Sequence, residues 1–324
     1  MNDEDNFLAE AFRRQLGAMI TPAAIRAVEE GKSATALWAE LNESGFVDAM
    51  LPEDAGGAGL DLAQAFPLIC AAGEFAMPLP FAETMVARGL LARHGVGIPG
   101  PGAIVMAASS NLLPGARHAD HALVGGDGGS ALVAITAQGD DLFNTGAATS
   151  IEQGELIATF AAEPDTVLVC AAAVSSALMA GAMARVLEMS LRHASERQQF
   201  GRSLGKFQAI QQQLAVLAEQ VLSAQVAARG AFVGASFDPV RVAAAKCRAN
   251  EAATVVCNIA HAIHGAIGVT AEFDLQLYTR RIKQWQLAFG SEVYWGARLG
   301  LARIASRAET TADFLRLQLA TKAD

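Results

Sequence analysis

The feature that most limits the fold is the spacing of apolar residues in the segment FQAIQQQLAVLAEQV. Its apolar side chains recur at alternating steps of three and four, at Phe207, Ile210, Leu214, Leu217 and Val221. This spacing places them in one stripe along a helix, as in the seam of a four-helix bundle. Aromatic residues make up only 6% of the chain and alanine is abundant, which favours close-packed helices over a β sandwich.

Helical patterns flank a region of different character. Residues 1–100 are predicted to form helices broken by Gly and Pro, and Asp61 is placed to cap one of them. Residues 101–165 hold the short β-prone runs GAIVMAA, HALVGG and ALVAITA between turns, which predicts a small β domain. Residues 166–324 are helical again, with one long helix predicted from SSALMAGAMARVLEMSLRHASERQQ. The 324 residues therefore divide into an N-terminal helical domain, a reduced middle β domain and a C-terminal helical bundle.

Charge and cysteine content restrict the class of partner and the compartment. The net charge of −9 argues against a general nucleic-acid or anionic-membrane surface. The acidic N-terminus lacks the pattern of a signal peptide, and no run of about 20 uninterrupted apolar residues predicts a membrane span. The cysteines have no CxxC spacing and are expected to be free thiols: Cys70, Cys170, Cys247 and Cys257. We therefore expect a cytoplasmic protein.

Most common functional motifs are missing from the sequence. There is no P-loop, no GxGxxG after a predicted strand and no GxSxG elbow. The HxxH pairs are His118 with His121 and His261 with His264. Neither pair has a further Cys, His or carboxylate ligand at a recognisable spacing, so no metal site is predicted.

The stretch ERQQFGRSLGKFQAIQ concentrates positive charge within this acidic chain. Arg197, Arg202 and Lys206 surround two glycines at a bend between two predicted helices. The start of a helix leaves N–H groups unpaired, and together with these side chains it suits a phosphate or pyrophosphate. Phe200 is placed to pack against a flat ring. From charge alone, a solvated helical corner paired to Glu196 is the favoured explanation of the cluster.

The segment RQQFGRSLGKFQAIQQQLA closely resembles the signature of the acyl-CoA dehydrogenase family. LPEDAGGAGL, at 51–60, resembles the family's N-terminal Pro-Glu-x-x-Gly-Gly turn. HGAIGVTAEFDLQLYTRR, at 264–281, resembles its Gly-Gly-x-Gly turn and the helix that follows. The resemblance implies a mainly α fold with N-terminal helices, a middle β domain and a C-terminal four-helix bundle, assembled as dimers or tetramers. It also implies FAD as cofactor and an acyl-CoA as substrate.

The resemblance assigns a set of cofactor-binding residues. These are Arg197, Phe200, Gln208, His264, Gly265, Ala266 and Ser291. The first three match the R-x-x-F-G and F-Q motifs, whose Arg and Gln reach the FAD of a neighbouring subunit. The next three match the family's glycine turn. Ser291 follows Gly290 in a pair that resembles the family's Gly-Thr. Ala262 stands where the family usually has a Gln, so one hydrogen bond to the cofactor is expected to be absent.

The residue that should take a proton is missing. The family removes the weakly acidic α-proton of a thioester with a carboxylate held in a dry site, while a hydride passes to the flavin. Its Glu stands either before the C-terminal Gly-Thr or on the long helix before R-x-x-F-G, and those positions are Phe289 and Ala171 here. No catalytic residue is therefore predicted. Glu292 fits a capping or helix-dipole role better than that of a displaced base, and Glu163 is a weaker candidate.

The middle region also departs from the family pattern. Nothing between residues 101 and 165 matches the segments that cradle the flavin ring. The chain resembles the shorter, base-lacking subunit of α2β2 acyl-CoA dehydrogenases that shorten steroid side chains, in its length, its LLPGARHADHALV segment and its lost Glu. That resemblance implies a base-bearing partner subunit, one FAD per heterodimer and bulky acyl groups, with electron-transferring flavoprotein as the family's usual acceptor. The alternatives are a self-sufficient homo-oligomeric flavin enzyme, either with a displaced base or a monooxygenase, and a non-catalytic helical scaffold.

Overall fold

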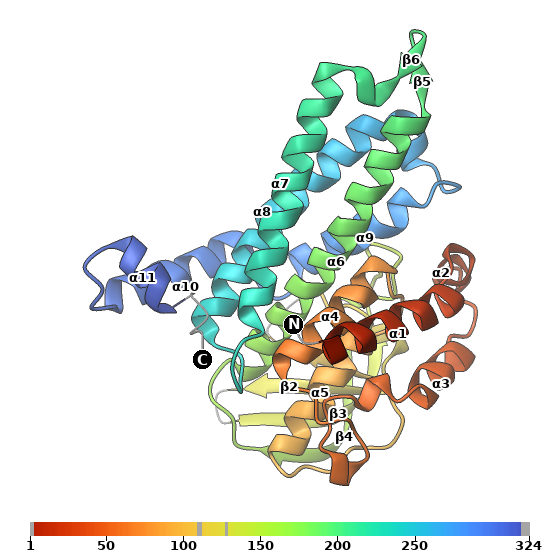
Figure 1. The fold of residues 1–324 in the computed structure, drawn as a ribbon. Helices are drawn as coiled ribbons and strands as arrows, with labels where there is room; N and C mark the ends of the chain where they lie inside the picture. Colours follow the sequence, from red (N-terminus) through yellow and green to blue (C-terminus); the bar gives the residue numbers. More distant parts are fainter. Residues whose placement is uncertain (1–2, 109–111, 127–128, 319–324) are drawn as a thin grey trace.

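The N-terminal part of the chain is helical. The computed structural model describes residues 3–108, 112–126 and 129–318 and is mainly α, with a four-stranded sheet and a short two-stranded hairpin (Figure 1). The predicted cap at Asp61 is confirmed, because its carboxylate accepts from Gln64 N at 2.8 Å while the Gln64 side chain accepts from Asp61 N at 3.1 Å. This reciprocal pair satisfies N–H groups that a helix start leaves unpaired. The N-terminal α-helices are α1 (Asp3–Met19), α2 (Pro22–Glu29), α3 (Thr35–Glu43), α4 (Leu62–Glu74) and α5 (Phe81–Arg93).

A small sheet follows the N-terminal helices. Its strands are β1 (Ile104–Ala107), β2 (His121–Gly126), β3 (Gly129–Gln138) and β4 (Ser150–Phe160). They lie side by side in chain order, with β1 and β2 parallel and the other pairs antiparallel. The predicted small β region is confirmed, and its β-prone runs form β1, β2 and β3. β4 was not predicted, because most of its side chains are exposed and its sequence therefore lacks the alternation of a half-buried strand.

The C-terminal part is a helical bundle built around one central helix. The bundle consists of α6 (Thr166–Glu196), α7 (Gln208–Ala231), α8 (Pro239–His264) and α9 (Leu275–Leu287). Helices α10 (Glu292–Ala305) and α11 (Thr311–Gln318) follow, and α10 packs on α8. Of the predicted seam, Leu217 and Val221 are buried, whereas the three residues nearer the start of α7 are only partly buried. The C-terminal four-helix bundle is therefore confirmed.

Helix α6 begins well before the predicted start at Ser175 and ends at Glu196 instead of Gln199. Its first turns, VLVCAAAV, are buried on all sides and show no helical periodicity, so the pattern could not mark their start. A close crossing with α4 fixes its position: a Cβ added at Gly181 would lie 1.9 Å from the carbonyl oxygen of Cys70. Only glycine permits this approach of the two backbones.

Two apolar helical stretches have the length and composition of membrane spans. They are Thr166–Glu196 and Pro239–Val269. In the first, 94% of the most apolar window is buried inside the protein, and in the second 44%. The apolar character of α6 is therefore explained by its place at the centre of the core.

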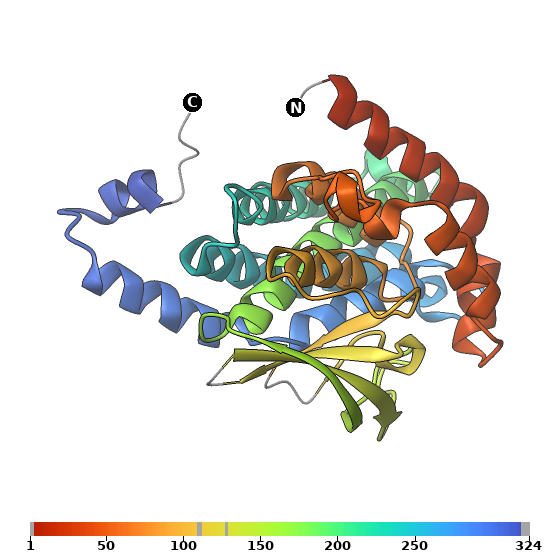
Figure 2. The same ribbon diagram turned by 90° about the horizontal axis from the view of Figure 1, so that it is seen from below.

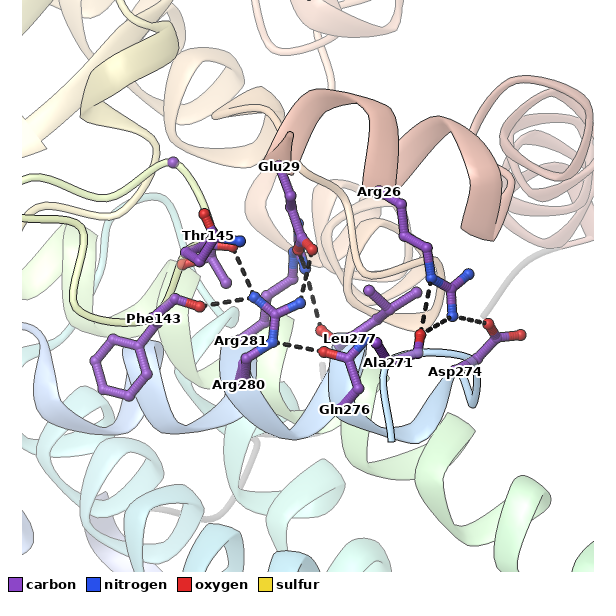
Figure 3. A network of polar contacts seen from close by, with 12 residues as sticks. Arg26, Glu29, Phe143, Thr145, Ala271, Asp274, Gln276, Leu277, Arg280 and Arg281 are labelled. Carbon is purple, nitrogen blue, oxygen red and sulfur yellow. Dashed lines mark hydrogen bonds and ion pairs between the residues drawn. The ribbon is translucent and has the colours of Figure 1, made fainter. Parts of the chain in front are cut away.

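A buried ionic junction ties the three parts of the chain together (Figure 3). The Glu29 carboxylate of α2 accepts from both Arg280 and Arg281 of α9, each at 2.6 Å. Arg280 also donates to the carbonyl oxygens of Phe143 and Asn144, in the connection between β3 and β4, at 2.7 Å each. Arg281 is 1% exposed, and burial lowers its pKa despite the neighbouring carboxylate. One carboxylate thus links the N-terminal helices, the sheet and the bundle.

The bundle separates two ends of the molecule. The small sheet lies at one end, and a second, two-stranded hairpin lies at the other (Figure 1). That hairpin is β5 (Gln198–Gln199) with β6 (Arg202–Ser203). Helices α10 and α11 project away from the body of the molecule (Figure 2).

Candidate functional site

The basic stretch singled out in the sequence forms the hairpin at the far end of the bundle. Gln198 pairs with Ser203 and Gln199 with Arg202, which leaves Phe200 and Gly201 as a two-residue turn. Both turn residues have positive φ, 52° and 76°. Glycine adopts this conformation freely, but a bulky residue such as Phe200 is strained in it. Such strain is typical of functional sites, where the position of a side chain is maintained at the cost of an unfavourable backbone conformation.

The aromatic ring at the turn faces outward. Phe200 is 92% exposed, and its ring meets the edge of Phe207 with ring centroids 6.3 Å apart. Arg202 lies over the Phe207 ring, 4.1 Å from its centroid. Arg197 and Lys206 are exposed. Over the described part of the chain, the Arg197 guanidinium has no ion pair with Glu196, so a paired helical corner is not what the geometry shows.

The start of α7 adds backbone donors to this surface. A 3-10 turn, η4 (Leu204–Lys206), leads into α7, and Leu204 N donates to the Arg197 carbonyl at 2.9 Å. Phe207 holds the N-cap position, where its side chain accepts no hydrogen bond. Gln208, the first helical residue, is exposed. An uncapped helix start beside an exposed arginine provides both the N–H groups and the charge that an anion needs.

The predicted glycine turn lies at the same end of the bundle. Helix α8 ends at His264, and Gly265 then takes φ 65° and ψ −147°, a conformation that glycine permits. Gly265 and Ala266 begin the 3-10 turn η5 (Gly265–Val269) and are exposed. The ring of His264 stacks on that of His193, near the end of α6, at 4.4 Å and 27°. This stack brings the glycine turn close to the last turn of α6, which leads into Arg197.

Ser291 is not part of this group. Its hydroxyl caps α10 by accepting from Tyr294 N at 3.2 Å. The neighbouring Gly290 carbonyl accepts from Asn250 Nδ2 at 3.1 Å. Asn250 and His264 lie on the same helix, and a rise of 1.5 Å per residue separates them by about 20 Å. The structure therefore gathers six of the seven predicted cofactor-binding residues at one end and leaves Ser291 apart.

Both positions where a base was sought are apolar and buried. Ala171 is 0% exposed and Phe289 is 2% exposed. Phe289 has a φ of 59°, and its carbonyl accepts from Trp295 Nε1 at 2.8 Å. The loop is therefore held in a strained conformation by buried hydrogen bonds while presenting no titratable side chain.

Glu292 lies in the first turn of α10, near a buried lysine. Burial lowers the pKa of Lys246 to about 7, and the charge of Glu292 opposes this effect. The lysine ammonium donates to the Trp285 carbonyl. The charge of Glu292 therefore favours the charged form of Lys246, and its place in the first turn of α10 also suits the helix dipole.

A cavity of about 400 Å³ lies between α5, the start of α6 and the loop joining α7 to α8. Its wall includes Cys170, whose thiol pKa burial raises to about 12. Glu163 also lines it but is exposed. The remaining lining is largely apolar, with Arg93 and His94 near the rim. The cavity has the size and character of a small-molecule pocket.

Where the sheet connections meet α9, little space remains. Pro114, Gly115 and Thr145 face Gln284 and other bundle residues around a cavity of about 20 Å³, which has room for about one water molecule. No flavin ring fits there. Glu83 lines the same place, and burial raises its pKa to about 7. Sequence reasoning missed Glu83, since residues 81–89 are buried on every face and no periodicity marks an inward acid.

The HxxH pairs do not form a metal centre within the described residues. His261 Nε2 lies 3.1 Å from Thr279 Oγ1, whereas His264 Nδ1 lies 2.8 Å from the Ala260 carbonyl. Throughout residues 3–108, 112–126 and 129–318, no three His, Cys, Asp or Glu side chains gather closely enough to hold an ion.

Comparison with known proteins matches both helical parts of the chain. Residues 2–96 match the family model "Acyl-CoA dehydrogenase, N-terminal domain", and residues 167–306 match "Acyl-CoA dehydrogenase, C-terminal domain". A relative from Mycolicibacterium smegmatis, acyl-CoA dehydrogenase IpdE2, is 29% identical over 301 residues, which cover 87% of this chain and 93% of the relative.

Two solved complexes have the same fold. The ChsE4–ChsE5 complex from Mycobacterium tuberculosis superposes with a TM-score of 0.79 at 22% identity, covering 95% of this chain and 99% of the matched chain. The Tcur3481–Tcur3483 steroid ACAD gives a TM-score of 0.80 at 25% identity, covering 94% and 99%. Each is a complex of two differently named proteins.

Proposed function

The chain belongs to the acyl-CoA dehydrogenase family, a family of FAD-dependent oxidoreductases, and we propose that it is the base-lacking subunit of a heteromeric member. In this proposal a homologous partner subunit supplies the glutamate that removes the α-proton of the acyl-CoA. This chain contributes contacts to the adenosine and pyrophosphate end of FAD.

The observation that carries the proposal is that the exposed hairpin residues and the small sheet lie at opposite ends of the helical bundle. Exposed Arg197, Phe200 and Gln208 lie at the hairpin end, while the sheet lies at the opposite end of the bundle (Figure 1). Helix α6 alone, at 1.5 Å per residue, spans about 45 Å between them. The hairpin residues are therefore out of reach of a ligand held by this chain's own sheet, and they are free to meet a second subunit.

FAD fits this chain only in part. The hairpin end offers a cation, a helix start and an exposed ring, which suit a diphosphate and a nucleoside. The junction of sheet and bundle leaves about 20 Å³, so the isoalloxazine ring would have to be held elsewhere. When bound, FAD supplies the acceptor for the substrate's β-hydride. In this proposal Arg197 binds the pyrophosphate, Phe200 packs on a ring, and Gln208 with the backbone of Gly265 and Ala266 orients the nucleotide.

The substrate class follows from the relatives. An acyl-CoA is the family's substrate, and one similar structure is a steroid ACAD. We propose a bulky, steroid-like acyl group, with electron-transferring flavoprotein as electron acceptor. The α2β2 assembly is proposed from the likeness to two-protein complexes.

The direct test is to purify the tagged chain from its native host and identify the protein that co-elutes. We expect a homologous chain with a glutamate at the position of Ala171 or Phe289, together with bound flavin. Arg197→Ala should release flavin from the complex, whereas Arg307→Ala, a matched change of an exposed arginine in the α10–α11 connection, should not. Strong acyl-CoA oxidation by this chain expressed alone would refute the proposal.

One observation favours the alternative of a self-sufficient enzyme. Glu163 lines the 400 Å³ cavity next to Cys170, the residue before Ala171. If Glu163 were a displaced base, the lone chain would oxidise acyl-CoA and Glu163→Gln would abolish that activity. An inactive lone chain excludes this alternative.

A further inference from the structure

Two histidines are stacked where α6 and α8 end. The His193 and His264 rings lie 4.4 Å apart at 27°, and Phe273 closes the cluster at 5.2 Å from His264. His264 is 5% exposed, and its Nε2 is buried without a hydrogen-bond partner among the described residues. The pair is therefore held by ring packing and not by a hydrogen bond between the rings.

The stack connects the two halves of the candidate cofactor surface. On α6, Arg197 N donates to the His193 carbonyl at 2.9 Å, so both residues belong to the same last turn. On α8, His264 directly precedes Gly265, whose backbone begins the exposed turn. Phe273 also contacts both rings, at 6.2 Å from His193 and 5.2 Å from His264, so the two helix ends meet in one small aromatic cluster whose closest pair is the histidine stack.

We infer that His193 is a positioning residue: by stacking on His264, it holds the Gly265–Ala266 turn in register with Arg197, so that both face the pyrophosphate end of the cofactor together. This inference rests on the proposed function, and it extends that function to a residue outside the family motifs.

The stack also gives the surface a dependence on pH. Burial lowers the pKa of His193, with Arg197 lowering it further and Glu196 opposing. Burial likewise lowers the pKa of His264, against its hydrogen bond to Ala260, while His193 and His261 lower it. The other charged groups around the groove beside His193 are Arg185, Arg192, Glu272 and Asp274.

The lowered pKa values of His193 and His264 determine how the stability of the stack changes with pH. Histidines whose pKa is lowered in the folded state favour the neutral form, so the stack is fully stabilising above the ordinary histidine pKa of about 6.5. Its contribution is lost as pH falls below that value toward the lowered folded pKa values. Protonating both rings would place two cations at stacking distance and open the turn.

The first test uses hydrogen exchange of the full chain, which does not depend on any cofactor. His193→Ala should raise exchange of the Gly265–Val269 amides at pH 7.5 by roughly two- to tenfold, the range expected for loss of an aromatic pair. His193→Phe keeps a ring without a titrating group, so it should retain protection at pH 7.5 and weaken the loss seen at pH 5.5. His94→Ala is the matched control, because His94 stacks on Phe160 at 4.6 Å away from this surface. Equal exchange in His193→Ala and the wild type would overturn the inference.

The second test measures flavin retention in the complex purified from the native host. His193→Ala should weaken FAD binding by a similar factor, and His193→Phe should restore it. If Arg197→Ala releases flavin while His193→Ala does not, the positioning role is wrong and the proposed function stands. If neither variant releases flavin, the proposed cofactor surface itself is wrong and the inference falls with it.

Discussion

Replacing the buried acid Glu83 with glutamine should stabilise the protein more at pH 8 than at pH 5. Glu83 lies in the first turn of α5, and burial raises its pKa from 4.5 to about 7, against the opposing effect of its own backbone N–H. An acid with a raised pKa contributes its stability fully below the unfolded value of 4.5. That stability is lost as pH rises to about 7 and does not change further above it. The charged form is thus disfavoured by about 3 kcal/mol at pH 8.

The measurement is urea unfolding of the wild type and Glu83→Gln at pH 5 and pH 8. The variant has no titrating group at position 83. The amount by which its free energy of unfolding exceeds that of the wild type should therefore be larger at pH 8 than at pH 5 by about 2.5 kcal/mol. This difference of differences does not depend on how well the new amide packs. Glu155→Gln, at an exposed position of β4, is the control and should show almost no such change. Parallel pH profiles for the wild type and Glu83→Gln would refute the reasoning.

Other substitutions test the junction, the helix crossing and the hairpin. Glu29→Gln leaves Arg281 buried without its charge partner, so the free energy of unfolding in urea should fall by about 3–5 kcal/mol. Gly181→Ala places a Cβ against the Cys70 carbonyl, and calorimetry should show a loss of about 2 kcal/mol or more as α4 and α6 separate. Phe200→Gly removes the strain of a φ of 52° without losing buried contacts. Its unfolding free energy should stay equal or rise by up to about 1 kcal/mol, while flavin retention in the complex falls.

The order of the chain's parts could be predicted from sequence because each has its own local signal. Asp61 begins a helix that its side chain caps, and the α7 seam at Leu217 and Val221 shows the period of a bundle. Where burial is complete, that signal disappears. The first turns of α6 and the first two turns of α5 are buried on every face, so neither the start of α6 nor the inward direction of Glu83 could be recognised.

The candidate site was predictable where motifs are contiguous and not where residues meet through folding. Arg197, Phe200 and Gln208 lie within one short stretch, and their shared location followed from it. The approach of His193 to His264 joins residues on different helices, so no local pattern reports it. Ser291 lies apart from the others for the converse reason: its motif is local, but it follows α9, which returns along the bundle away from the hairpin.

Two phenylalanines with positive φ differ in whether contacts inside the protein offset their backbone strain. Phe200 and Phe289 have nearly the same φ, 52° and 59°, and so a similar conformational cost. The cost at Phe289 is balanced inside the molecule, because its ring is buried and its carbonyl accepts from Trp295. The ring of Phe200 is 92% exposed and gains almost nothing from its own chain. The strain at Phe200 is not offset by contacts within the chain, which is expected when a binding partner uses the exposed ring. The partner of this protein should therefore be sought at the hairpin, where Phe200 is exposed, and not at the loop around Phe289.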